Sequence, residues 1–91
     1  KPSIIYTNDY EKDLKDNPTL KDYIEKTESD IRNSPNYQEK LHKPLNNGTW
    51  VGLGYRHAHV TSNFCIIYLW NPEEKEIIFK RLMSHTEMDK S

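Results

Sequence analysis

The stretch from Phe64 to Trp70 constrains the fold of this chain more than any other feature. Every residue in it is apolar or aromatic, so a strand built from it has no polar side to turn toward water. Such a strand lies in the middle of a sheet, with both faces at least partly covered. The sequence therefore predicts a sheet whose central strand is this segment.

The neighbouring segments supply the rest of that sheet. Of the 31 residues counted as hydrophobic, 18 lie between Trp50 and Met83. β-branched and aromatic residues dominate three runs there, at residues 50–60, 64–70 and 77–83, with turn-forming residues at 61–63 and 71–76 between them. Connections this short join antiparallel strands, so we expect a β-meander.

The first half of the chain is typical of helices that cover a sheet. After a short apolar run at residues 4–6, Thr7 or Asn8 can cap a helix that extends to about residue 16, where Asn17 and Pro18 break it. A second helix, capped at Thr19, has apolar positions at helical spacing, namely Leu20, Tyr23, Ile24, Thr27 and Ile31. The expected fold class is α+β: a short N-terminal strand, two helices and an antiparallel β-meander, with the helices packed on one face.

Length and cysteine content narrow the class of protein. The chain has 91 residues, which suffice for one small domain, so we expect residues 1–91 to form a single domain. The lone Cys65 cannot form an internal disulfide, and a buried thiol in a reducing compartment is expected. The longest apolar run is too short to span a membrane, and residues 1–10 do not resemble a signal peptide. These features predict a soluble cytoplasmic protein with no membrane partner.

Candidate catalytic groups gather in the second half of the chain. The net charge of −1 gives no global case for binding nucleic acid, but all four histidines follow residue 41. Successive side chains of a strand point to opposite faces. On the first long strand we therefore expect one face to carry Tyr55, His57 and His59 and the other to carry Arg56, Ala58 and Val60. On the last strand we expect Phe79, Arg81 and Met83 to share a face.

Two further histidines border the sheet. His85 follows the last strand, and His42 lies in the loop that enters the sheet. We therefore expect three histidines and Arg81 to converge at one edge. Such a set suits metal-independent cleavage of RNA with no cofactor. One imidazole removes the proton of the ribose 2′-OH, the guanidinium stabilises charge on the phosphorane, and a second imidazole protonates the leaving 5′ oxygen.

Simpler interpretations of these residues stay open. A histidine in a small domain is most often an ordinary solvated or hydrogen-bonded residue. Arg81 could serve only to pair with Glu74 or Glu76 across the sheet. His57 and His59 could chelate a metal, because residues two apart on a strand point the same way, although no nearby cysteine pair or carboxylate completes such a site.

Motifs spread over the second half resemble one known family. They are His42 with Pro44 and Leu45, Trp50 with Gly52, the run Tyr55-Arg56-His57-Ala58-His59-Val60, then Ile66-Ile67-Tyr68, Phe79-Lys80-Arg81 and Ser84-His85. Over about residues 40–88 the chain resembles the RelE-type toxins of bacterial toxin–antitoxin pairs, and among them the YafQ-like branch. The order of one strand, two helices and a sheet is also that of the RelE fold.

The resemblance implies a ribosome-dependent mRNA endonuclease that a cognate antitoxin silences. It implies a catalytic set of His59, His85, Arg81 and His42, with His59 as general base and His85 as general acid, or the reverse. Substrate-binding residues are expected beside them, where aromatic side chains stack on bases; the candidates are Arg56, Asn63, Phe64, Lys80 and Tyr55. The expected partners are the antitoxin, the ribosome and mRNA in the ribosomal A site.

The chain also differs from that family. Asn63 and Phe64 stand where the family often has Asp-Trp, and Met83 replaces a glycine. Two other functions therefore stay open. One is a non-enzymatic toxin that inhibits gyrase by binding, as ParE toxins do, and the other is an attenuated relative that mainly binds its antitoxin. A gyrase-binding protein has no need of converging histidines, so their presence favours the nuclease.

Overall fold

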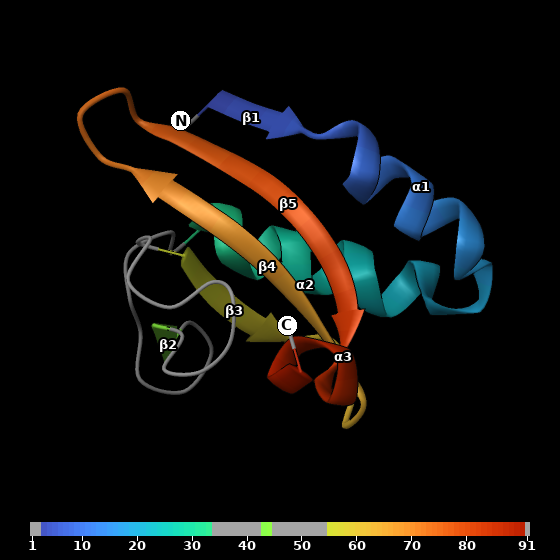
Figure 1. Cartoon of the computed structure of the whole chain (residues 1–91). Coiled ribbons are helices and arrows are strands. Elements are labelled where there is room, and N and C mark those ends of the chain that lie inside the picture. Colours follow the sequence, from blue (N-terminus) through green and yellow to red (C-terminus); the bar gives the residue numbers. More distant parts are fainter. Residues whose placement is uncertain (1–2, 34–42, 45–54, 91) are drawn as a thin grey trace.

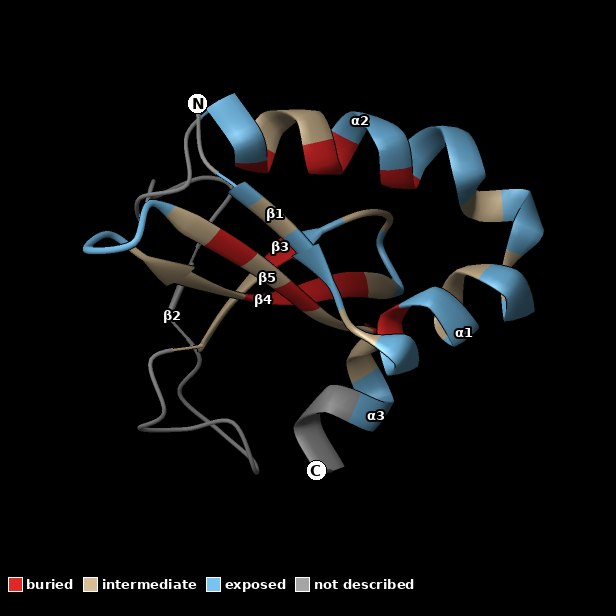
Figure 2. Ribbon diagram, turned by 90° about the horizontal axis from the view of Figure 1, so that it is seen from above, coloured by how far each residue is buried: buried red, intermediate tan, exposed pale blue. Residues whose placement is uncertain are grey.

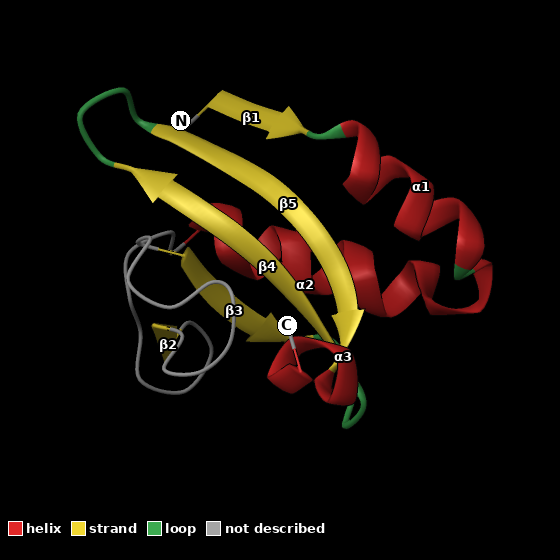
Figure 3. Ribbon diagram, in the orientation of Figure 1, coloured by secondary structure: helices red, strands yellow, loops and turns green. Residues whose placement is uncertain are grey.

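A mixed sheet carries two helices on one side and a third helix on the other (Figures 1 and 2). The structure is a computed structural model that describes residues 3–33, 43–44 and 55–90. Along the chain the elements are β1 (Ser3–Tyr6), α1 (Asn8–Asp16), a 3-10 turn (Pro18–Leu20), α2 (Lys21–Asn33), β2 (Lys43–Pro44), β3 (Tyr55–His59), β4 (Phe64–Asn71), β5 (Glu76–Ser84) and α3 (His85–Lys90) (Figure 3).

The strand order across the sheet is β1-β5-β4-β3-β2. The apolar segment that begins at Phe64 forms β4, so the expectation of a central strand is confirmed. Strands β3, β4 and β5 pair antiparallel, as the short connections predict, but β1 pairs parallel to β5. The α+β class is confirmed, and the sheet is mixed because α1 and α2 separate β1 from the meander in the sequence.

Helix α1 begins where its capping residue predicts, but the expected cap of the second helix at Thr19 is wrong. Thr19 lies inside the 3-10 turn, because Pro18 starts a tight turn that leads directly into α2 at Lys21. Thr7 is the N-cap of α1, and its hydroxyl accepts a hydrogen bond from the Tyr10 N–H at 3.1 Å. In α2 the expected positions Ile24, Thr27 and Ile31 are buried, but Tyr23 is 57% exposed. Tyr23 lies at the margin of the apolar stripe, one residue and about 100° from Ile24, and so points away from the sheet.

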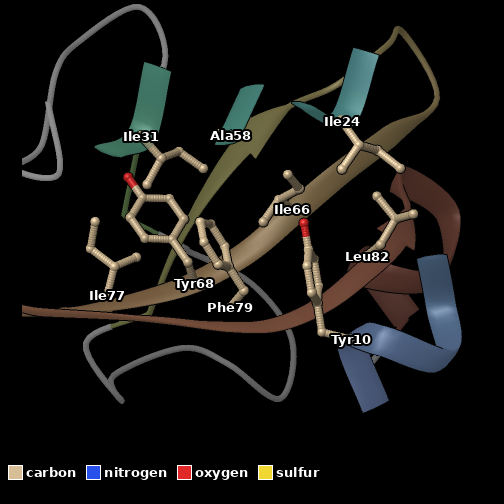
Figure 4. Packing of buried hydrophobic residues seen from close by; sticks show 9 residues of the cluster. All are labelled: Tyr10, Ile24, Ile31, Ala58, Ile66, Tyr68, Ile77, Phe79 and Leu82. Carbon is tan, nitrogen blue, oxygen red and sulfur yellow. The ribbon is translucent and has the colours of Figure 1, made fainter. Parts of the chain in front are cut away.

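The principal core lies between the helices and the sheet. Figure 2 shows the buried residues of α2 on the side that faces the strands. Side chains from both helices and from three strands meet there (Figure 4), and they are Tyr10, Ile24, Ile31, Ala58, Ile66, Tyr68, Ile77, Phe79 and Leu82. The carboxylate of Glu28 is buried beside this cluster and accepts a 2.6 Å hydrogen bond from the Tyr10 hydroxyl. None of the helices described here is long and apolar enough to cross a membrane.

A register shift in β5 changes which side chains share a face. Ile67 lies opposite Arg81 and Tyr68 lies opposite Phe79, so Lys80 is an extra residue in β5. Phe79 therefore packs in the core under the helices, whereas Met83 packs with Cys65 on the other face. The expectation that Phe79, Arg81 and Met83 share one face is wrong, because the bulge reverses the alternation between Phe79 and Arg81.

Candidate functional site

The face of the sheet turned away from α2 carries the candidate site, and we name it the second face. A small cluster of buried side chains, Cys65, Ile67 and Met83, lies on it, and Tyr55 packs against that cluster. Strand β3 is regular, so His57 and His59 share this face with Tyr55. Ala58 is buried under the helices. The two faces of β3 are therefore those predicted from the sequence.

Helix α3 brings His85 to His59. In Figure 2, α3 lies on the opposite side of the sheet from α2. The two imidazoles lie face to face, with centroids 5.0 Å apart and rings inclined by 29°. His85 Nε2 lies 3.3 Å from His59 Nδ1. At this distance one nitrogen donates and the other accepts a hydrogen bond.

The start of α3 fixes the position of His85. The Ser84 hydroxyl accepts a hydrogen bond from the Glu87 N–H at 3.1 Å, and the Glu87 carboxylate accepts one from the Ser84 N–H at 3.4 Å. These reciprocal bonds form a capping box. The His85 N–H also donates to the Asn63 carbonyl oxygen at 2.7 Å. The backbone of His85 is thus tied both to its own helix and to the turn between β3 and β4.

Cys65 completes a compact group on the second face. It lies opposite His59 in the β3–β4 ladder, and its thiol is fully buried, as the apolar run around it predicts. The Cys65 sulfur lies 3.4 Å from His59 Nδ1. One ligand atom from each of His59, Cys65 and His85 lies within 4.8 Å of the other two. His57 meets His59 edge to face, with ring centroids 5.3 Å apart, and it is not part of this group.

Arg81 is held by helix α1. Its Nε donates to Asp13 Oδ2 at 2.8 Å and its Nη2 donates to Asp13 Oδ1 at 3.2 Å, which is a bidentate pair. The same carboxylate accepts a hydrogen bond from the Leu82 N–H at 2.9 Å. The bonds to Asp13 raise the pKa of the Arg81 guanidinium, which stays charged. The partner of Arg81 is therefore Asp13, and not Glu74 or Glu76.

The expected substrate-binding residues divide between the two faces. Lys80 Nζ lies 5.9 Å from the centroid of the Tyr55 ring, in a cation–π contact on the second face. Arg56 alternates with His57 and lies on the helix-covered face. Phe64 packs against the core under the helices. Asn63 is exposed and supplies its backbone carbonyl to His85.

The structure thus brings together two of the four expected catalytic residues, His59 and His85. The Arg81 guanidinium instead forms an ion pair with Asp13 of α1. His42 lies outside the described residues. Reasoning from the sequence missed the roles of Asp13 and Cys65 around this site. It also missed the helix that carries His85, although the pattern Ser84-His85-Thr86-Glu87 is a readable capping-box signal.

Comparisons with known proteins identify the fold. Neither a protein-family model nor a curated protein matches the sequence. Among solved structures, a chain of the Escherichia coli DinJ–YafQ toxin–antitoxin complex superposes with a TM-score of 0.75 and 25% identity, covering 96% of both chains. A metal-bound toxin from Helicobacter pylori superposes with a TM-score of 0.73 and 22% identity, covering 97% of this chain and 99% of that one.

A third similar structure widens the comparison beyond YafQ. It comes from the toxin–antitoxin complex RelBE2 of Mycobacterium tuberculosis, with a TM-score of 0.68, 17% identity, and coverage of 92% of this chain and 98% of that one. All three superpose on more than nine-tenths of this chain, so they share its fold. By its fold, this chain groups with the RelE- and YafQ-like toxin superfamily.

Proposed function

We propose that this chain is the toxin of a type II toxin–antitoxin pair and cleaves mRNA on the ribosome. The observation that carries the proposal is the pairing of His59 and His85, whose ring nitrogens lie 3.3 Å apart at the solvent edge of a RelE- and YafQ-like fold. Two hydrogen-bonded imidazoles can share one proton, so one is ready to accept a proton while the other is ready to donate one.

Cleavage then proceeds by transfer within the RNA. One imidazole, His59 in our assignment, removes the proton of the ribose 2′-OH, whose oxygen attacks the adjacent phosphorus. The bond from phosphorus to the 5′ oxygen breaks, and the second imidazole, His85, donates a proton to that oxygen. The products are a 2′,3′-cyclic phosphate and a 5′-OH. The two rings must move apart to admit the phosphate, and His85, on the short helix α3, is the ring that moves.

Arg81 is the group proposed to stabilise the negative charge of the phosphorane. Asp13 engages Nε and Nη2 of its guanidinium, which leaves the Nη1 group as the one that would meet a phosphate oxygen. Tyr55 and Lys80 are proposed to bind the RNA beside the histidines, because the ring offers a stacking surface and the ammonium offers a positive charge. His42 is retained as an assisting residue on the strength of the family resemblance.

An antitoxin and the ribosome are the proposed partners of this chain. Two of the similar structures are complexes of a toxin with its antitoxin. A cognate antitoxin is therefore proposed for this chain as well. The net charge of −1 gives little general attraction to RNA, so delivery of mRNA by the ribosome is the simplest way to bring substrate to the site.

The test is to express the chain alone in a bacterium and to map new 5′-OH ends on a reporter mRNA. Cuts should appear in the reading frame and should vanish when the start codon of the reporter is removed. His85→Ala should reduce cleavage by about 10²–10⁴-fold, the usual contribution of one general acid or base, and His57→Ala should retain cleavage as the matched control. Undiminished cleavage by His85→Ala would remove His85 from the mechanism. Growth arrest with damaged DNA and intact mRNA would instead support a ParE-like toxin.

A further inference from the structure

The group formed by His59, Cys65 and His85 has the dimensions of a metal site. Zinc binds histidine nitrogen at about 2.0–2.1 Å and cysteine sulfur at about 2.3 Å in a tetrahedral site, which puts two nitrogens about 3.3 Å apart and a nitrogen and a sulfur about 3.6 Å apart. The observed separations are 3.3 Å between His59 Nδ1 and His85 Nε2, and 3.4 Å between His59 Nδ1 and the Cys65 sulfur. Two of the three edges of the group therefore already fit a single ion.

We propose that His59, Cys65 and His85 bind Zn(II), and that the bound ion switches off the chemistry of the second face. This is a different set from the histidine pair considered on the sequence alone, since His57 lies outside the group of three. The third edge, from Cys65 to His85, is within 4.8 Å. A small shift of the His85 ring toward the sulfur closes it.

Rigid elements hold the three side chains in place. His59 and Cys65 face each other across the β3–β4 ladder, and the capping box of α3 holds His85. Ligands that are positioned before the ion arrives bind it with less loss of conformational freedom. The fold brings the two histidines together although they are 26 residues apart in the sequence.

The chemistry of the three groups selects the ion. A thiolate and two imidazoles suit zinc or copper, whereas Mg²⁺ and Ca²⁺ prefer oxygen ligands. Cys65 is fully buried, His85 is half-buried and His59 is exposed, so the sulfur lies on the inner side of the group and the histidines on its solvent side. An ion would therefore enter from the solvent side and keep its fourth position there, which is the pattern of a zinc site with one open position.

The consequence for activity rests on the proposed function. A bound ion uses the ring nitrogens of His59 and His85 that the proposed mechanism needs as general base and general acid. A nitrogen that donates its lone pair to a metal cannot accept a proton. Zinc is thus expected to inhibit the proposed cleavage by occupying its acid–base pair, and a chelator is expected to restore it.

The binding test does not depend on activity. The full chain, purified with a chelator and a reductant, is titrated with Zn(II) by calorimetry, and separately with Co(II) while its absorption is recorded. One ion should bind per chain, and the Co(II) form should show a thiolate-to-cobalt charge-transfer band. Cys65→Ser should lose that band and bind Zn(II) roughly a hundredfold more weakly or worse, whereas the control His57→Gln should bind as the parent does.

Each outcome of that test decides the proposal. Binding without the charge-transfer band, or binding that Cys65→Ser leaves unchanged, would overturn the assignment of the sulfur as a ligand. If Cys65→Ser does not fold, as judged by circular dichroism, His85→Gln takes its place and should weaken binding in the same way. Tight Cu(II) binding with no measurable Zn(II) binding would overturn the choice of ion.

A second readout separates this proposal from the proposed function. RNA cleavage by the parent chain should fall at least tenfold when one equivalent of Zn(II) is added, and should return with chelator. Persistence of full cleavage with zinc bound would overturn the inhibitory role. If the chain cleaves no RNA under any condition, the proposed function fails, and the calorimetric and cobalt results still decide the metal site.

Discussion

The carboxylate of Asp13 joins a helix to the edge of a sheet. It accepts two hydrogen bonds from the Arg81 guanidinium and one from the Leu82 N–H. Strand β1 ends at Tyr6, opposite Phe79, so none of the strands in the described residues lies beside the rest of the β5 edge on that side. Asp13 supplies an acceptor to this edge and at the same time orients the arginine.

Asp13→Ala should therefore destabilise the fold. We expect a loss of about 1–2 kcal/mol in the free energy of unfolding, since charged hydrogen bonds disappear while Arg81 stays one-third exposed and solvent-screened. Urea denaturation measures this loss, and Asp16→Ala, an exposed change on the same helix, should stay within about 0.5 kcal/mol of the parent. Equal stability of the two variants would show that the pair with Arg81 contributes nothing.

Tyr10 gives the fold a dependence on alkaline pH. Burial, and then the neighbouring Glu28 carboxylate, raise the pKa of the Tyr10 hydroxyl, and burial likewise raises the pKa of Tyr68. In the unfolded chain a tyrosine ionises near pH 10. Above that pH the folded chain therefore still holds protons that the unfolded chain has released. The contribution of these tyrosines to the free energy of unfolding is at its full value below about pH 10, and it is lost as the pH rises further.

The change that tests this dependence is Tyr10→Phe. It should flatten the decline of unfolding free energy between about pH 9 and about pH 11, because one of the three tyrosines with a raised pKa (Tyr6, Tyr10 and Tyr68) is gone. It should also lower stability at neutral pH, since Glu28 loses a 2.6 Å hydrogen bond. Urea midpoints over that pH range measure both effects, with the exposed Tyr23→Phe as control. A slope identical to that of the parent would contradict the assignment to Tyr10.

At the scale of elements, helix α3 is short and its position depends on its cap. It spans His85–Lys90, so nucleation is costly relative to the few hydrogen bonds gained. The reciprocal bonds between Ser84 and Glu87 offset part of that cost. Because His85 is the first residue of α3, the geometry of the His59–His85 pair depends on whether this helix is formed.

Ser84→Ala should loosen α3 by about 1 kcal/mol, the usual loss at an N-cap, while Ser84→Thr should keep most of the capping. Amide hydrogen exchange of residues 85–90 should become about fivefold faster in the alanine variant, with the exchange of β4 unchanged. Under the proposed function, cleavage should fall with it. Unchanged exchange in Ser84→Ala would mean that the capping box does not hold the helix.

In the molecule as a whole, one face of the sheet holds the principal hydrophobic core and the other holds the candidate site. The core that joins α1, α2 and the strands lies on one face (Figure 4), and the histidines with Cys65 lie on the other. A change in the helix-side core is therefore expected to act on stability rather than on the candidate site. Ile31 of α2 is fully buried there.

Ile31→Ala should cost about 2–5 kcal/mol of unfolding free energy, and Ile31→Val about 0.5–1.5 kcal/mol. Both variants should unfold in one cooperative transition, because the same cluster contains residues of both helices and of β3, β4 and β5. Denaturation followed by circular dichroism and by tryptophan fluorescence measures this. Two separate transitions would show that the helices and the sheet do not form one cooperative unit.

Features that depend on local sequence pattern could be predicted from the amino-acid sequence. The unbroken apolar run that starts at Phe64 predicts a strand covered on both faces, and it is the central strand of the sheet. Thr7 caps a helix where its hydroxyl predicts, and alternation places His57 and His59 on the face opposite Ala58. In each case residues within a few positions of one another decide the outcome, through periodicity or capping.

Contacts between segments far apart in the sequence could not be predicted from local pattern. Asp13 meets Arg81 across 68 residues, and His85 meets His59 across 26. The bulge at Lys80 put Met83 on the face opposite Phe79, because a single extra residue in a strand reverses the face of every side chain that follows it. Periodicity within one segment contains no information on the register between segments. That register follows from how the helices and the sheet pack, and it is what joins His59, Cys65 and His85 in one group.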